Sequence, residues 1–352
     1  MQTDMHYYGT YVMARASGLS SAVAQVIATA AEYVDDSNNV EVVLQDGTFL
    51  DAVATAHHPV NAENLDEFDQ RKVWVPFHFL PGNEGNSFEE RLICQKDSAI
   101  AQEMVANHLA LENQGFMLEL LGITAHAYAD TFSHYGFSGI TSNLNRVDYD
   151  SINLDVKDHS ILDYIKGKAD AFNDKYLAGK IADDVGLGHG AVSTFPDRPF
   201  LTWSFKYHAT GESSGQRINQ QTFLEACQKL HDMFAKFAEA NPELRDPLSY
   251  CQFPDIQNAT AQVIAVEGDM ETRIAAWQEA VTAGKIYPNP NKEAIPTYNK
   301  TFPQDITILK SQTFDTVESA EGYAFLAAAN YHRNYVLNEL LPKYGLHVLV
   351  GS

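Results

Sequence analysis

The chain has 352 residues, and its 46 Asp and Glu outnumber its 24 Lys and Arg, which gives a formal charge of −22 at pH 7. With 45% hydrophobic residues it can fill a sizeable core, which argues against a disordered protein. The charge argues against non-specific nucleic-acid binding or docking on an anionic membrane, although metal ions bound in one cleft can reverse the local field.

The first residues and the cysteines bear on the compartment. Residues 1–18 contain no basic segment followed by an apolar one, and no stretch approaches the ~18 consecutive apolar residues of a membrane-spanning helix. Three widely spaced cysteines are typical of small buried residues rather than of a disulfide framework. We therefore expect a cytoplasmic protein without a transmembrane segment.

The first 82 residues change from helical to extended character. Apolar residues recur at spacings of three and four over residues 6–36, and a break at Gly18 predicts two helices joined by a short turn. Residues 40–56 hold two β-branched runs around an Asp-Gly turn, which predicts a β-hairpin. The apolar run at 73–80 contains Pro76 and is predicted to be an edge strand or an extended loop.

Most of the remaining chain is predicted to be helical. The longest pattern spans residues 88–135, which Gly115 is expected to divide, and residues 140–160 are polar enough to predict a loop. Further helices are expected at 160–182, 219–240, 260–284 and 317–343, a structured loop at 183–203, and a long connection at 285–316. The pattern favours a mainly α multi-helix bundle: one domain over 1–352, with a helical core at about 1–210, a β insertion at 40–82, and additional packed helices at 211–352.

The sharpest functional signal is a row of polar residues in an apolar helix. His126, Asp130 and His134 are four residues apart, so on an α-helix they fall within about 80° of one another. Two imidazoles flanking a carboxylate can ligate one or two metal ions, with the carboxylate as a bridge. The alternative is a surface helix with chance histidines, but apolar neighbours favour burial. The same face reaches back to Gly122, which would let another backbone or a metal cluster approach closely.

Acidic residues near the start of the chain are further candidate ligands. Asp4 and His6 form an Asp-x-His pattern, for which helix capping by Asp4 is the simpler explanation. Asp35 and Asp36 lie at the predicted C-terminal end of a helix, where the helix dipole disfavours negative charge. A nearby cation would relieve that cost, whereas a solvated helix end would need none.

Histidines outside the helices complete the candidate set. His78 lies in an aromatic segment, where it is either a satisfied core histidine or a ligand. Of the adjacent His57 and His58, only one normally points into a site, and His57 is preferred. His189 stands between two glycines, whose backbone freedom suits a ligand or a catalytic base. The remaining histidines have no such context.

The segment LLGITAHAYADTFSH at residues 120–134 resembles the LG-x-x-x-H-x-x-x-D-x-x-x-H helix of the zinc-dependent phospholipase C family. That family shares its all-α fold with the single-strand-specific zinc nucleases, and the match is specific over roughly residues 1–140. The whole chain also resembles an uncharacterised bacterial family. Its members begin D-x-H and contain Y-V-D-D and W-x-P-F-H-F-L-P-G-N, all of which occur here.

The resemblance implies a cluster of two or three divalent metal ions, most simply zinc, with iron or manganese as alternatives. One ion would be held by His126 and Asp130, by Asp35 or Asp36, and by His78 or His57. Asp130 would bridge to a second ion at His6. His134 would serve a further ion together with His189.

Two features depart from that family's pattern. Its members use an N-terminal Trp whose amine and carbonyl ligate metal, whereas this chain starts at Met1, so Asp4 is expected to substitute. The family's H-x-x-x-E or H-x-x-x-D segment has no clear equivalent, because the nearest such spacing, His159 to Asp163, lies in another context. A third ion is therefore left open.

The leading hypothesis is a metal-dependent hydrolase of small-molecule or lipid phosphoesters, in which clustered ions activate water. Asp35 or Asp36 would accept the proton of that water, and Arg198, Lys206 and His208 are candidates to contact a phosphate. Two alternatives stay open: a di-iron enzyme that activates oxygen, and a non-enzymatic effector or binding protein stapled by metal. No stable nucleic-acid binding is expected, and the sequence leaves the metal, the substrate and the oligomeric state undetermined.

Overall fold

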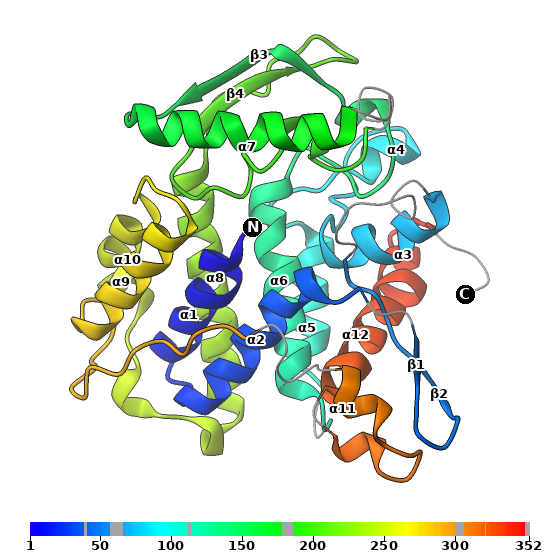
Figure 1. The fold of residues 1–352 in the computed structure, drawn as a ribbon, viewed down its shortest axis with the longest axis vertical. Coiled ribbons are helices and arrows are strands. Elements are labelled where there is room, and N and C mark those ends of the chain that lie inside the picture. Colours follow the sequence, from blue (N-terminus) through cyan, green and yellow to red (C-terminus); the bar gives the residue numbers. More distant parts are fainter. Residues whose placement is uncertain are drawn as a thin grey trace.

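The computed structural model describes residues 1–38, 41–56, 66–111, 114–177, 186–299, 306–320 and 322–348. Within these residues the fold is mainly α, as predicted, with two small β-sheets. Figure 1 shows the helices gathered around α6, with one sheet at the top of the view and a hairpin at the lower right.

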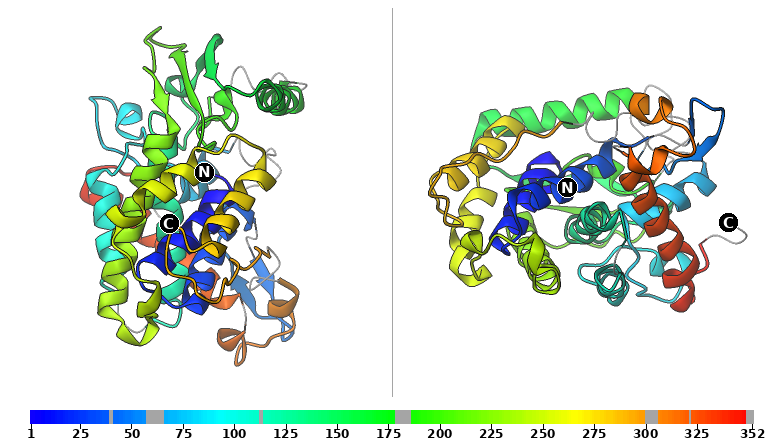
Figure 2. Two further views of the ribbon diagram at one scale, coloured as in Figure 1. Left: turned by 90° about the vertical axis from the view of Figure 1, so that its left-hand side faces the viewer. Right: turned by 90° about the horizontal axis from the view of Figure 1, so that it is seen from below.

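Four helices form the centre: α1 (Thr10–Ala16), α2 (Ser21–Asp36), α6 (Met117–His134) and α8 (Asn219–Ala240). Helix α2 packs along α6, and α8 contacts both α1 and α6. In the view from below in Figure 2, α6 and α8 are seen nearly end-on. Their apolar faces join in one buried cluster that includes Ile27, Leu121 and Phe234. Residues beyond 211 therefore build part of the core itself.

A glycine allows α2 and α6 to approach closely. A Cβ atom at Gly122 would lie 2.4 Å from the carbonyl oxygen of Ile27 and 2.7 Å from the Cβ atom of Ala30. Of the two uses expected for Gly122, the approach of another backbone is the one observed. The contact holds the C-terminal end of α2 beside the half of α6 that carries the polar row.

The start of the chain is a turn of π-helix, η1 (Asp4–Gly9), that continues into α1. Gly18, with φ +93°, separates α1 from α2 and confirms the predicted pair of helices. All residues of η1 are buried, and the turn contacts α2, α6 and α10 (Met270–Thr282). The N-terminal residues are thereby held in the middle of the molecule, as Figure 1 shows.

The predicted hairpin is confirmed. Strand β1 (Glu41–Val43) pairs antiparallel with β2 (Phe49–Asp51). In the turn, the Asp46 carboxylate accepts a hydrogen bond from the Thr48 backbone N–H at 3.0 Å. Helix α11 (Ile306–Lys310) contacts β1.

The prediction of a strand or loop at residues 73–80 is wrong. Helix α3 (Glu67–Phe77) covers most of this run, and Asp66 caps its start with two hydrogen bonds to backbone N–H groups. Pro76 lies in the last turn, directly before the helix ends. The apolar side of α3 packs against α6 and α12 (Tyr323–Tyr335), and this burial outweighs the strand preference of its valines.

The helical pattern at 88–135 is divided more than once. It forms α4 (Phe88–Arg91), α5 (Ala99–Leu109) and α6. Gly115 falls between α5 and α6, as predicted. A second break precedes α5, where the Ser98 hydroxyl accepts a hydrogen bond from the Ala101 backbone N–H at 3.2 Å.

The prediction of a loop at 140–160 is also wrong for residues 147–155. Strand β3 (Val147–Asp155) pairs with β4 (Thr202–Tyr207), which pairs in turn with β5 (Arg217–Ile218). The partner of β3 lies far along the chain, so no local pattern reveals the pairing. The predicted helix at 160–182 is confirmed up to residue 177 by α7 (His159–Leu177), which lies beside this sheet in Figure 1, and residues 178–182 lie outside the described residues.

The remaining helices follow the predictions in outline. Helix α8 confirms the one at 219–240, whereas the one at 260–284 is broken into α9 (Phe253–Ile264) and α10, with Asp269 capping α10. The last helix runs from α12 through a π turn, η8 (Val336–Leu340), into α13 (Leu341–Lys343). Short 3-10 turns occur at η3 (Asn143–Asn145), η4 (Gly190–Val192), η5 (Pro242–Leu244), η6 (Pro247–Ser249) and η7 (Val317–Ser319). Among the described residues, no helix has the length and apolar character needed to cross a membrane.

Candidate metal centre

Helix α6 carries its polar row on a buried face. His126 and Asp130 are fully buried, and His134 is 4% exposed. A surface helix with chance histidines is therefore excluded. Buried ionisable side chains need partners, and those partners come from other elements.

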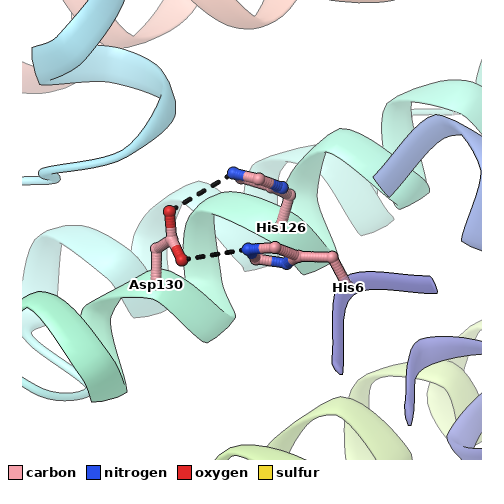
Figure 3. Close-up of side chains that lie close together, drawn as sticks. All are labelled: His6, His126 and Asp130. Atoms are coloured by element: carbon pink, nitrogen blue, oxygen red, sulfur yellow. Dashed lines mark ion pairs between the residues drawn. The ribbon is translucent and has the colours of Figure 1, made fainter. Parts of the chain in front are cut away.

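Asp130 is at the centre of the site. Its Oδ1 atom lies 3.1 Å from His6 Nε2 and 2.5 Å from the amino nitrogen of Met1. Its Oδ2 atom lies 3.3 Å from His126 Nε2 and 3.3 Å from His78 Nδ1. Figure 3 shows one oxygen directed at His126 and the other at His6. The two oxygens thus face different sets of nitrogen atoms, as in a bridging carboxylate.

Within the described residues, three groups of side chains have ligand atoms within 4.8 Å of one another, close enough to hold a metal ion. The groups are Asp35, His78 and His126; His6, His126 and Asp130; and His134, His189 and Asp197. We call them the first, second and third groups, and together the metal centre. Imidazole and carboxylate donors suit zinc, iron or manganese.

The first group joins the end of α2 with the residue that follows α3. Asp35 Oδ1 lies 3.7 Å from His78 Nδ1 and 3.9 Å from His126 Nε2. The sequence predicted either His78 or His57 as a ligand. His78 reaches the centre, and His57 lies outside the described residues. The Asp35 side chain is 29% exposed, so the centre meets solvent on this side.

The second group stacks two imidazoles. The rings of His6 and His126 are parallel, with centroids 3.7 Å apart. His6 is buried, and its Nδ1 has no hydrogen-bond partner within the described part of the chain, while its Nε2 faces Asp130 Oδ1. Leaving such a group unsatisfied costs free energy, and a bound metal ion would remove that cost.

The third group joins His134 with His189, as expected, and adds Asp197. His134 Nε2 lies 3.0 Å from Asp197 Oδ1, and His189 Nε2 lies 3.7 Å from Asp197 Oδ2. Asp197 is a candidate ligand that sequence reasoning misses. The only signal is a carboxylate shortly after His189, at a spacing unlike the four-residue spacing that the resemblance implies.

A glycine lets the His189 loop reach α6. Gly188 has φ +54°, and a Cβ atom there would lie 2.6 Å from Cζ of Phe79. Phe79 also stacks on His134, with ring centroids 4.8 Å apart. The backbone freedom inferred for the Gly-His-Gly segment therefore allows the loop to pack on Phe79.

Main-chain carbonyl groups orient four histidines. The ring N–H donates from His126 Nδ1 to Ala31 (2.7 Å), from His78 Nε2 to Thr55 (2.8 Å), from His134 Nδ1 to His78 (2.9 Å) and from His189 Nδ1 to Ser193 (2.7 Å). Because a carbonyl oxygen only accepts, each of these nitrogens carries the proton. In each case the other ring nitrogen faces a carboxylate of the centre. Metal-binding histidines are typically oriented in this way.

The amino group of Met1 is buried within the centre. Besides Asp130, it lies 3.3 Å from Asp197 Oδ1 and 3.5 Å from His134 Nε2. Burial opposes its positive charge, but Asp130 and Asp197 outweigh burial and raise the pKa of the amino group to about 11. Met1 thus occupies the position expected for Asp4.

Two predicted ligands are engaged elsewhere. Asp4 forms a buried ion pair with Arg273 of α10, with 2.7 Å between Oδ2 and Nε. Asp36 accepts a hydrogen bond from the Tyr298 hydroxyl at 2.7 Å. Among the described residues neither belongs to the three groups. Successive side chains on a helix point about 100° apart, so Asp35 faces the centre and Asp36 does not.

The charges of the centre shift one another's pKa values. Burial opposes ionisation of Asp130, but His134 and the amino terminus hold its pKa well below the usual value. Burial lowers the pKa of His6 to about 3 and that of His189 to about 4. Ionised carboxylates and neutral imidazoles are the forms that bind metal ions.

The model of DUF6765, a family of unknown function, matches residues 1–340, a range that contains the whole metal centre. No curated protein and no solved structure matches the chain.

Proposed function

This chain belongs to DUF6765, a family of unknown function, and we propose that it is a metal-dependent hydrolase of phosphate esters. Two or three divalent ions, most simply zinc, would be held by the three groups of the centre. The observation that carries the proposal is the position of Asp130, whose two oxygens face His6 on one side and His78 with His126 on the other. A shared carboxylate of this kind holds neighbouring ions close enough to act on one substrate.

The charge of the centre supports an anionic substrate. Its three carboxylates, Asp35, Asp130 and Asp197, would offset only part of the charge of two divalent ions, and still less of three. Uncompensated positive charge in a largely buried site favours binding of an anion. A phosphate ester supplies that anion, whereas a neutral ester or an amide does not.

Divalent ions at this position would lower the pKa of a bound water and neutralise charge that develops on phosphoryl oxygens. The histidines, whose rings are fixed by hydrogen bonds to main-chain carbonyl groups, would orient the reacting groups. Asp35 has the most exposed carboxylate of the centre, at 29%, and is our candidate to accept a proton from water. Asp36, the other predicted base, is held by Tyr298.

The order of the ligands along the chain also supports the proposal. The grouping follows what the resemblance to zinc-dependent phospholipases C implies. The residues concerned are His6, Asp35, His78, His126, Asp130, His134 and His189. That resemblance also implies an N-terminal amine among the ligands. The amino group of Met1 lies beside Asp130 and Asp197, where it could take that part.

Elemental analysis of the purified protein, joined to assays on phosphomonoesters, phosphodiesters and phospholipids, tests the proposal. We expect about two or three equivalents of divalent metal and hydrolysis of at least one of these classes. Asp35→Asn and Asp36→Asn are matched variants of adjacent residues. Asp35→Asn should lower kcat/KM by about 100-fold or more and reduce bound metal, while Asp36→Asn should stay near wild type.

Protein that binds metal but hydrolyses none of these esters would contradict the proposal. Bound iron with consumption of oxygen would favour the oxygen-activating alternative. A metal whose removal only unfolds the chain would favour a metal-stapled binding protein. Equal losses of kcat/KM in Asp35→Asn and Asp36→Asn would show that Asp35 is not the specific proton acceptor.

A further inference from the structure

Arg198 is a buried cation next to the third group. It directly follows Asp197 and is 3% exposed. Its Nη2 atom donates to the Thr194 hydroxyl at 3.0 Å, and its guanidinium lies 5.5 Å from the centroid of the Tyr164 ring. Its Nε–H is buried without a hydrogen-bond partner in the described part of the chain.

A second buried arginine makes this position more positive. Arg273 of α10 is 2% exposed, and its guanidinium lies 5.8 Å from the centroid of the ring of Phe200, two residues after Arg198. Arg273 is already held by Asp4 and by the Gln2 side chain, whose Oε1 atom accepts from Nη2 at 2.6 Å. The Asp4 carboxylate therefore pairs with Arg273, and among the described residues it forms no ion pair with Arg198.

Asp197 does not compensate Arg198 fully. It attracts the guanidinium, but its oxygens face His134, His189 and the Met1 amino group. A metal ion in the third group would engage the same oxygens. Arg198 would then face added positive charge, and a buried cation without a counter-charge is costly.

We propose that Arg198 binds a phosphoryl group of the substrate beside the third group, an inference that rests on the proposed hydrolase function. A guanidinium offers several N–H donors in a plane that matches two oxygens of a phosphate. A tetrahedral phosphate has further oxygens to direct at the metal centre. Tyr164 and Thr194, which flank the guanidinium, are half-buried, and the proposal has the anion approach from their side.

The other basic candidates lie elsewhere. Lys206 is exposed on β4, and His208 is exposed just after that strand. The alternative for Arg198 is a purely structural part, in which it joins the loop before β4 to α7 through Thr194 and Tyr164. The two readings differ in a measurable way, because removing an uncompensated buried charge should not destabilise the ligand-free fold, whereas breaking a structural contact should.

Titration of the metal-loaded protein with inorganic phosphate, followed by calorimetry, tests the proposal directly. Arg198→Met should weaken phosphate binding at least about tenfold at unchanged metal content, and Arg198→Lys should lie between it and wild type. In the hydrolysis assay, Arg198→Met should raise KM for a phosphoester. The matched control, Lys236→Met, removes an exposed charge on α8 and should leave affinity and KM unchanged. The Tm of ligand-free Arg198→Met should be no lower than that of wild type.

Equal phosphate affinity in wild type and Arg198→Met, at equal metal content, would overturn the proposal. So would a lowered Tm of Arg198→Met with phosphate affinity retained, which would mark a structural residue. These results leave the hydrolase function standing if the wild type still cleaves phosphoesters. Conversely, phosphate binding that depends on Arg198 in a protein that cleaves no ester would support the anion site and refute the hydrolase.

Discussion

At the scale of single residues, burial sets how a histidine responds to pH, inside the metal centre or outside it. His108 and His332 have no functional context in the sequence, yet both are buried, with ring centroids 5.2 Å apart. His332 Nε2 donates to the Pro76 carbonyl at 2.9 Å, so this nitrogen carries the proton and Nδ1 does not. This pair lies outside the three groups and offers a test of how burial sets the response to pH.

The stability of the fold should fall in mild acid partly because of His332. Burial lowers its pKa to about 4, while an unfolded chain would have a value near 6.5. Between these values the unfolded state binds a proton that the folded state does not. The stabilisation is therefore complete above pH 6.5 and is lost as pH falls towards 4, by about 3 kcal/mol.

His332→Gln keeps a donor for the Pro76 carbonyl and removes the titration. Urea unfolding between pH 7 and 4.5 should show a shallower loss of stability in His332→Gln than in wild type. His347→Gln, a matched change at an exposed histidine, should follow the wild-type curve. Parallel curves for wild type and His332→Gln would show that this histidine is not the source of the acid sensitivity.

At the scale of elements, the contact between α2 and α6 positions the first group. Gly122→Ala would place a methyl group 2.4 Å from the Ile27 carbonyl oxygen, so the helices must separate. We expect a loss of about 1–3 kcal/mol in the free energy of unfolding, together with weaker metal binding, because Asp35 and His126 lie on the separated helices.

Gly167→Ala in α7 is the matched control. Gly167 is exposed, and nothing lies within 4 Å of a Cβ atom built there. Alanine favours a helix over glycine, so this variant should gain about 0.5–1 kcal/mol and retain its metal. Equal stabilities of the two variants in chemical denaturation would mean that the close approach at Gly122 is unimportant.

Elements that depend on neighbouring residues in the sequence could be predicted. Elements that depend on packing against distant segments could not. The hairpin around Asp46 and the helix pair around Gly18 depend on turn residues that the sequence displays. Strand β3 depends on pairing with β4, and α3 on burial against α6 and α12. A local pattern carries no information about such partners, so both segments were misassigned.

At the scale of the whole molecule, the metal centre should couple to stability. Its ligands come from η1, α2, α6, the end of α3 and the loop before β4, so an ion bound there ties distant segments together. Binding to the folded state alone stabilises it by about 2.7 kcal/mol when free metal is 100 times its Kd.

Thermal unfolding with chelator and with added zinc measures this coupling. We expect chelator to lower Tm and zinc to restore it, with a smaller restoration at pH 5. Burial opposes protonation of His78, but its hydrogen bond to Asp130 raises its pKa, so protons compete with the metal for this imidazole. The zinc response should shrink in Asp35→Asn, which loses a ligand, and persist in Asp36→Asn. A Tm that neither chelator nor zinc changes would show that the folded chain binds no metal at this centre.

The sequence by itself determined the mainly α character and the polar row on α6, because helical periodicity places His126, Asp130 and His134 on one face. It also indicated His6, Asp35, His78 and His189 as partners. Only the tertiary structure decided that the Met1 amino group enters the centre, that Asp197 completes the third group, and that Asp4 and Asp36 belong to Arg273 and Tyr298. The physical reason is that periodicity fixes directions within one helix, whereas a metal centre needs atoms from several elements within a few ångströms, and their packing alone sets those distances.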